Sequence, residues 1–155
     1  MKFQKILGVD PGLETIGFAF LDGKKLRDFG VIKTKSGDEK SARLADIFAD
    51  FSDLISEFSP DAIAIEKLFF VKNVTNGISV AEARGVLLLA AFQKGIPIFE
   101  VSPKDAKLAI CGSGNAPKIQ IQKAVQKIFG LKNLPRPDDA ADAIAIAFWA
   151  AGKKF

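Results

Sequence analysis

The stretch ILGVDPGLETIGFAFLD, residues 6–22, decides the fold of this chain. Its first half belongs to a strand predicted over Lys2–Asp10, which is apolar and ends in the turn signal Asp-Pro-Gly. Its second half predicts a strand over Gly17–Leu21, and Asp22-Gly23 predicts a tight turn into a third strand over Leu26–Thr34. We therefore expect the chain to open with an antiparallel meander of three strands.

Helical and strand patterns alternate after this meander. Apolar residues at helical spacing predict an amphipathic helix over Glu39–Phe58, and the apolar run Asp61–Glu66 predicts a buried strand parallel to the first. A second helix over Thr75–Lys94 and a fifth strand over Pro97–Val101 follow. Further helices are expected over Pro103–Ala109, Lys118–Phe129 and Asp138–Gly152. The predicted fold class is α/β, a five-stranded mixed sheet, part antiparallel and part parallel, flanked by helices.

Length and composition favour one globular domain. The chain has 155 residues, of which 48% are hydrophobic and 26% charged, so we expect a single domain over residues 1–155. One cysteine, Cys111, leaves no intramolecular disulfide, and the N-terminus lacks the apolar stretch of a signal peptide. The run GVLLLAAF, residues 85–92, is too short to cross a bilayer. These features predict a cytoplasmic protein and not a membrane protein.

The net charge and the absence of histidine limit the ligands and the catalytic groups that this protein can use. The 22 Lys and Arg residues exceed the 18 Asp and Glu residues, and the net charge of +4 agrees with binding a polyanion without requiring one. The sequence contains no histidine. Proton transfer or metal binding must therefore use carboxylates, lysines, water or the backbone, and histidine-ligated zinc is excluded.

Four carboxylates are expected to meet at one edge of the sheet. Asp10 ends the first strand and Glu66 ends the fourth, and the carboxyl ends of neighbouring parallel strands lie about 5 Å apart. Asp139 and Asp142 stand at positions i and i+3 near the start of the last helix, so both can project from one face. Clustered carboxylates repel one another unless cations neutralise them, and oxygen ligands select hard ions such as Mg²⁺ or Mn²⁺. Two such ions about 3.5 to 4 Å apart can clamp an in-line phosphoryl displacement.

Each of these acids also has a purely structural explanation. Asp10 can accept hydrogen bonds within its turn, and Asp138, Asp139 and Asp142 can serve as helix-capping residues. Glu66 favours the functional interpretation, because an ionised acid at the end of an apolar strand needs a partner.

Four segments together resemble the RuvC-type Holliday-junction resolvases, crossover junction endodeoxyribonucleases of the ribonuclease H-like fold. ILGVDPGLETIGFAFLD resembles their opening strand-turn-strand, AIEKLFFVKN their second acidic strand, EARGVL their central helix and DDAADAIAIA their terminal acidic helix. The resemblance implies that Asp10, Glu66, Asp139 and Asp142 are the catalytic, metal-binding carboxylates. The family varies between acid and histidine at the third position, and the adjacent Asp138 leaves open which acid reaches the metal.

The resemblance also implies an activity and its partners. A homodimer binds a four-way DNA junction in recombination and repair and nicks two strands of like polarity symmetrically, leaving 5′-phosphate and 3′-hydroxyl ends. Each active site uses two Mg²⁺ ions, for which Mn²⁺ can substitute. A preferred cutting sequence and cooperation with a RuvA-RuvB branch-migration complex are further implications.

Basic and aromatic side chains are expected to flank the acids. Lys104, Lys107 and Lys118 lie near helix starts, where they either hold phosphates or are simply solvated; the resemblance places Lys107 and Lys118 at DNA-contacting positions. Phe69, in a loop with Lys72, can stack on an unpaired base or anchor the loop to the core, and its position in the family favours stacking near the junction centre.

The second helix is apolar nearly all round over residues 86–92, which predicts burial on more than one side. Either a partner subunit or the chain's own terminal helix would cover it.

Three other functions fit part of the pattern. A YqgF-type nuclease acting on RNA shares the fold, although the DPG turn, the EARG helix and DDAAD favour the resolvase. An actin-like sugar kinase or ATPase needs a second phosphate-binding domain, for which the chain is too short. A non-catalytic junction-binding protein agrees with the basic charge balance.

Overall fold

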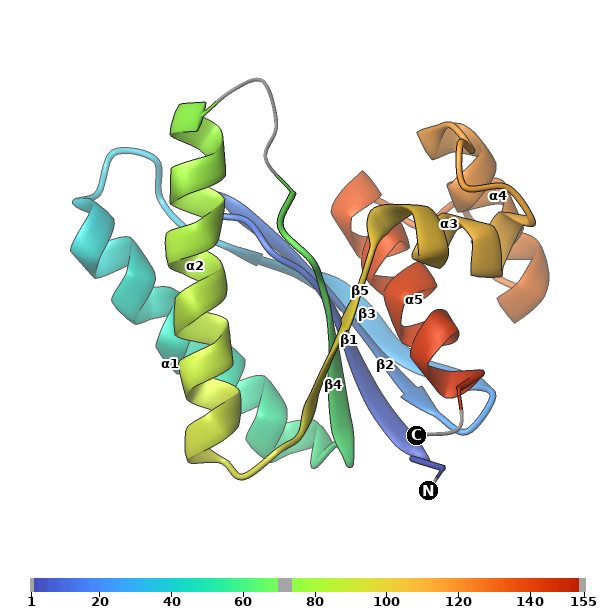
Figure 1. The fold of residues 1–155 in the computed structure, drawn as a ribbon, viewed down its shortest axis with the longest axis horizontal. Helices are drawn as coiled ribbons and strands as arrows, with labels where there is room; N and C mark the ends of the chain where they lie inside the picture. The colour runs from blue at the N-terminus through green and yellow to red at the C-terminus, as the bar shows by residue number, and fades with distance from the viewer. Residues whose placement is uncertain (1, 70–73, 154–155) are drawn as a thin grey trace.

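The structure is a computed structural model and describes residues 2–69 and 74–153. Its order of strands and helices is the predicted one, and Figure 1 shows a twisted sheet between two groups of helices. The strands are β1 (Lys5–Asp10), β2 (Thr15–Asp22), β3 (Lys25–Lys33), β4 (Ala62–Glu66) and β5 (Ile98–Val101). The helices are α1 (Lys40–Phe58), α2 (Val74–Gln93), α3 (Pro103–Cys111), α4 (Lys118–Phe129) and α5 (Asp138–Ala151).

The sheet has the strand order β3-β2-β1-β4-β5, which confirms the predicted five-stranded mixed sheet. The pairs β1–β2 and β2–β3 are antiparallel, and the pairs β1–β4 and β4–β5 are parallel. Strand β1 begins later than expected, because the Asp61 carboxylate accepts hydrogen bonds from the backbone N–H groups of Gln4 and Lys5. In the β1–β4 register Val9 lies opposite Ile65, so Asp10 and Glu66 end neighbouring strands at the same level.

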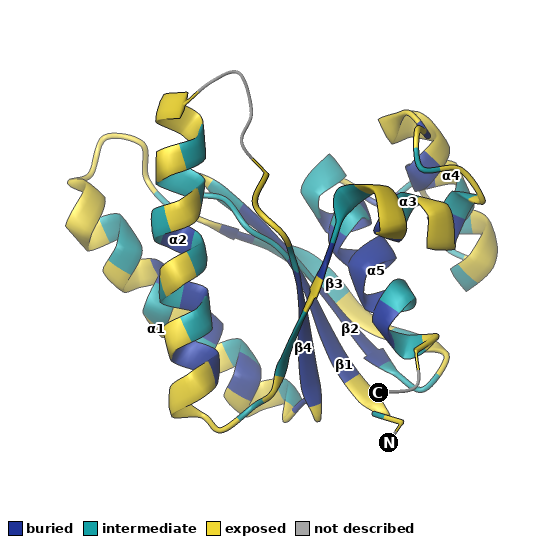
Figure 2. Cartoon of the chain, in the orientation of Figure 1, coloured by how far each residue is buried: buried dark blue, intermediate teal, exposed yellow. Residues whose placement is uncertain are grey.

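Alternating side chains along the strands build a core on each face of the sheet. Leu7 and Ile63 face α1 and α2, whereas Ile6 and Ala64 face α5. Figure 1 shows α1 and α2 on one side of the sheet and α3, α4 and α5 on the other, and in Figure 2 the strands are dark blue where these layers cover them. Because side chains alternate with a period of two, the acids that follow Gly8 and Ala64 by two residues face α5.

Helix α2 differs from expectation in two respects. By length and composition alone the whole helix could cross a membrane, although the apolar run at residues 85–92 is too short to do so. Four of its residues are nevertheless buried within the molecule: Ala83, Leu87, Ala90 and Ala91. The idea that the terminal helix covers it is wrong, because α5 packs on the opposite face of the sheet (Figure 1). Exposed apolar side chains therefore remain along α2.

Candidate active site

The structure brings the four predicted carboxylates to one place. Asp10 and Glu66 end β1 and β4, and Asp139 and Asp142 lie in the first two turns of α5, which begins at the carboxyl end of these strands (Figure 1). The Asp10 and Asp139 side chains share a hydrogen bond, and Asp10 also interacts electrostatically with Glu66 and Asp142. The acids that the sequence placed on three separate elements thus form one cluster.

Two glycines allow α5 to approach the sheet closely enough for this. Gly17 lies opposite Asp10 in the β1–β2 register, and a Cβ on Gly17 would overlap the backbone carbonyl of Asp139. Gly8, two residues before Asp10, is similarly close to the carbonyl of Ala143. The main chain of α5 therefore rests directly on the strands, and this contact fixes the height of the acids on α5 above Asp10.

Burial and mutual repulsion raise the pKa values of Asp10, Glu66 and Asp142. Burial, followed by the charges of Glu66, Asp142 and Asp139, raises the pKa of Asp10 well above its ordinary value. Burial and then Asp142 raise the pKa of Glu66 to about 7, although Lys107 opposes this shift. Burial also raises the pKa of Asp142 to about 6 against the opposing effect of Lys118. The ionised cluster is thus unfavourable until positive charge compensates it.

This arrangement predicts that stability in metal-free buffer falls with rising pH. The raised values mean that folded Glu66 and Asp142 keep protons that the unfolded chain has already released above about pH 4. Their stabilising contribution is therefore complete below the unfolded pKa values and is lost as the pH rises through about 6 to 7. Thermal unfolding between pH 4 and 8 in a chelating buffer should show this decline, and Glu66→Gln should flatten it. A melting temperature that rises through this window would contradict the prediction.

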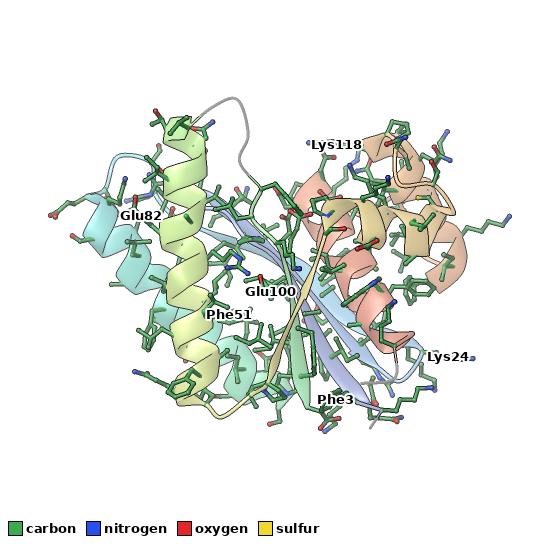
Figure 3. The ribbon with its side chains drawn as sticks, in the orientation of Figure 1. Phe3, Lys24, Phe51, Glu82, Glu100 and Lys118 are labelled. Carbon is green, nitrogen blue, oxygen red and sulfur yellow. The ribbon has the colours of Figure 1, made fainter. Side chains whose placement is uncertain are left out.

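Two of the predicted lysines lie beside the acids. The Ser102 side chain accepts a hydrogen bond from the Asp105 N–H, so α3 begins directly after β5 and carries Lys107 to the site. Lys107 lines a hollow of about 230 Å³ together with Glu66 and Asp142. The charge of Lys118, at the start of α4, lowers the pKa of Asp142. Figure 3 shows Lys118 close to the start of α5.

Asp138 has different partners from Asp139. Its carboxylate lies 3.2 Å from the Lys118 ammonium and 3.3 Å from the Gln122 amide nitrogen. The Gln122 side chain is buried and also donates to the Pro135 carbonyl, which holds it in place. Asp139, by contrast, shares its hydrogen bond with Asp10. The geometry therefore favours Asp139 over Asp138 as the third acid of the cluster.

Two other predicted contact residues, Lys104 and Phe69, lie in the first turn of α3 and just after β4. Lys104 packs its aliphatic stem against Gly114 in the loop between α3 and α4. Phe69 follows β4 and exposes 54% of its surface, as expected for a ring that is free to stack. Lys72 lies outside the described residues.

The donor set suits a hard divalent cation. Four partly buried carboxylates supply only oxygen ligands, as Mg²⁺ and Mn²⁺ prefer. Across residues 2–69 and 74–153, no three Asp, Glu or Cys side chains are close enough to form a complete metal-binding group. The residues fit such an ion, and Asp10, Glu66, Asp139 and Asp142 are those able to hold it.

A mixed sheet that ends in two acids, with two more on a helix packed over them, defines a nuclease of the ribonuclease H-like class. The family model described as "Crossover junction endodeoxyribonuclease RuvC" matches residues 6–149. The chain therefore belongs to the RuvC family of crossover junction endodeoxyribonucleases, and it is an enzyme. This membership decides against the YqgF-type and sugar kinase alternatives.

Individual relatives agree with this assignment. The chain is 49% identical to crossover junction endodeoxyribonuclease RuvC of Gloeobacter violaceus, with 93% of this chain and 86% of the relative covered. It is 47% identical to that of Thermotoga maritima, with 96% and 90% covered. Thermus thermophilus RuvC, solved "in complex with Holliday junction substrate", gives a TM-score of 0.87 at 33% identity over 94% of this chain and 92% of that one. A yeast mitochondrial Holliday junction resolvase, at 16% identity and a TM-score of 0.66 over 94% and 78%, shares the fold.

Proposed function

We propose that this enzyme resolves four-way DNA junctions by metal-dependent phosphodiester hydrolysis at Asp10, Glu66, Asp139 and Asp142. The observation that carries the proposal is the convergence of these four carboxylates on one edge of the sheet, where Asp10, Glu66 and Asp142 have raised pKa values. The similarity to a RuvC solved with a Holliday junction substrate supports the choice of substrate.

The residues at this site would have different roles in the reaction. Two bound divalent ions, Mg²⁺ or Mn²⁺ in its place, would supply an activated water and stabilise the departing oxygen. Asp10 stands within reach of the other three acids and would hold both ions. Lys107 and Lys118 both interact with Asp142, and their charges would hold the DNA phosphates beside the scissile bond. Cleavage would leave 5′-phosphate and 3′-hydroxyl ends.

Substrate choice provides the direct test of this function. The purified chain should be incubated in Mg²⁺ with a four-way DNA junction, a linear DNA duplex of the same sequences and a structured RNA. We expect paired nicks in the junction and much slower cleavage of the other two substrates. Preferential cleavage of the RNA would contradict the proposal, as would binding of the junction without any cleavage.

We also propose that the enzyme acts as a homodimer paired through α2. Its exposed apolar residues follow one stripe along the helix, and Gly85 in the middle of the stripe leaves open space. This stripe comprises Val74, Ile78, Leu89 and Phe92, with exposures of 65%, 54%, 50% and 81%. Two-fold pairing would put two identical acidic sites on one assembly, as symmetric nicking requires.

Pairing through α2 predicts that Phe92→Asp yields a monomer. A charge at this 81% exposed position has no cost in the isolated chain but is unfavourable in an apolar interface. Gel filtration with light scattering should show the mass halve, and junction cleavage should change from paired to single nicks. Ile128→Asp, at a similarly apolar but 46% exposed position on α4, is the matched control and should leave the mass unchanged. Equal behaviour of the two variants would rule out this interface.

The remaining assignments belong to the same proposal. Residues 1–155 would form one nuclease domain acting in the cytoplasm, with a RuvA-RuvB branch-migration complex as partner. Phe69 would stack on an unpaired base near the junction centre, and Lys72 and Lys104 would extend the DNA contacts of Lys107 and Lys118.

A further inference from the structure

Arg84 links α2 to the end of strand β4. Its Nε donates a hydrogen bond to the backbone carbonyl of Glu66 at 3.2 Å, and its terminal guanidinium nitrogen pairs with the Glu100 carboxylate on β5. The Arg84 side chain is only 15% exposed, whereas that of Glu100 is 48% exposed. In Figure 3 Glu100 lies between β5 and α2. One guanidinium of α2 thus contacts both β4 and β5 near the acidic cluster.

The carbonyl of Glu66 needs a donor from outside the sheet. Strand β1 ends at Asp10, level with Glu66, and the next residue is Pro11, which has no N–H group. On the β5 side of β4, the last hydrogen bond runs from the Lys67 N–H to the Val101 carbonyl, so it does not involve the Glu66 carbonyl. A partly buried carbonyl without a donor is costly, and Arg84 supplies that donor from the α2 layer.

The side chain and the backbone carbonyl of Glu66 therefore have separate roles. Its carboxylate faces α5 and the other acids, and its backbone carbonyl is held by a helix from the opposite face of the sheet. We propose that Arg84 is a positioning residue, which holds the end of β4 so that the Glu66 carboxylate stays in register with Asp10. This inference rests on the proposed role of Glu66 in catalysis.

Replacing Arg84 and Glu100 separately distinguishes this role from simple packing. Arg84→Met keeps the aliphatic stem but removes both contacts, whereas Glu100→Gln removes only the ion pair and leaves the bond to the Glu66 carbonyl. We expect Arg84→Met to lower the single-turnover cleavage rate about 10- to 100-fold, because small displacements of reacting groups have effects of this size. Its junction affinity should stay within about twofold, and Glu100→Gln should cleave within about threefold of the unsubstituted chain.

Metal binding gives a readout that is independent of cleavage. Calorimetric titration with Mn²⁺ should show weaker binding to Arg84→Met than to Glu100→Gln, because a displaced Glu66 is a poorer ligand. Arg84→Lys, which keeps the charge but not the two-sided geometry of the guanidinium, serves if Arg84→Met does not fold. Arg84→Lys should also lower the single-turnover cleavage rate, by about tenfold.

Three outcomes would overturn the inference. These are normal cleavage by both Arg84 variants, equal losses in Arg84→Met and Glu100→Gln, and a loss of junction affinity that accounts for the whole fall in rate. Failure of the proposed function itself is separable, because the unsubstituted chain would then not cleave the junction, or Asp10→Asn would cleave it as fast, whatever the Arg84 variants do.

Discussion

Asp10→Asn is expected to abolish junction cleavage, by about a thousandfold or more, while junction binding is retained. Asp10 interacts with Glu66, Asp139 and Asp142, so its carboxylate could serve ions held by any of these acids. Asn has nearly the same shape but removes the charge that attracts a divalent cation. Cleavage should be measured in Mg²⁺ with a labelled four-way junction, and binding by gel retardation in a chelating buffer.

The same substitution should stabilise the metal-free fold. Burial and three neighbouring acids raise the pKa of Asp10, so an uncharged amide at this position removes repulsion. The melting temperature of Asp10→Asn near pH 8 in a chelating buffer should therefore exceed that of the unsubstituted chain. Asp28→Asn, on an exposed part of β3, is the control and should change neither cleavage nor melting. Retained cleavage by Asp10→Asn would refute the assignment of the site, whereas junction binding without cleavage by the unsubstituted chain would favour a non-catalytic junction-binding protein.

Gly17→Val is expected to reduce cleavage about 100-fold without touching any acid. A Cβ at Gly17 would overlap the Asp139 carbonyl, so the start of α5 must move away from the sheet. Asp139 and Asp142 would move with it, away from Asp10 on the adjacent strand. Overpacking of this kind costs about 1 to 3 kcal/mol of stability, and displacement of catalytic groups by about 1 Å can cost a hundredfold in rate.

The expected signature of Gly17→Val is a loss of rate at temperatures where the chain is still folded. Circular dichroism should first confirm folding at the assay temperature, and single-turnover cleavage should then be compared with that of Gly37→Val. Gly37 lies in the loop before α1, and a Cβ there meets no atom within 4 Å. A Gly17→Val chain that cleaves as well as Gly37→Val would mean that the contact does not set the position of the acids.

Strand ends and helix spacing were sufficient to predict the acidic cluster. Asp10 and Glu66 each follow an apolar strand, and the parallel pairing that brings them together follows from the order of the elements. Asp139 and Asp142 share a helix face because of their spacing alone. These are local patterns combined with one topological rule, which is why they can be read without coordinates.

The contacts that hold the cluster in place could not be predicted in this way. Gly17 and Gly8 allow close packing because α5, more than a hundred residues later, lies directly on them. Arg84 contributes because its side chain donates a hydrogen bond to the Glu66 carbonyl. A glycine between apolar residues of a strand is a usable signal of close approach, but it does not name the approaching segment. The partner of α2 was left open for the same reason, since only the packing shows that α5 lies on the other face.

The glycine-mediated contact has a practical consequence for protein engineering. Because main chain meets main chain at Gly8 and Gly17, the separation between the terminal helix and the sheet does not depend on the size of the surrounding apolar side chains. Volume-conserving swaps at neighbours such as Ile144 or Leu21 should thus alter heat resistance with little change in turnover. Directed evolution of a hardier variant has freedom throughout this core, provided that the two glycines are left untouched.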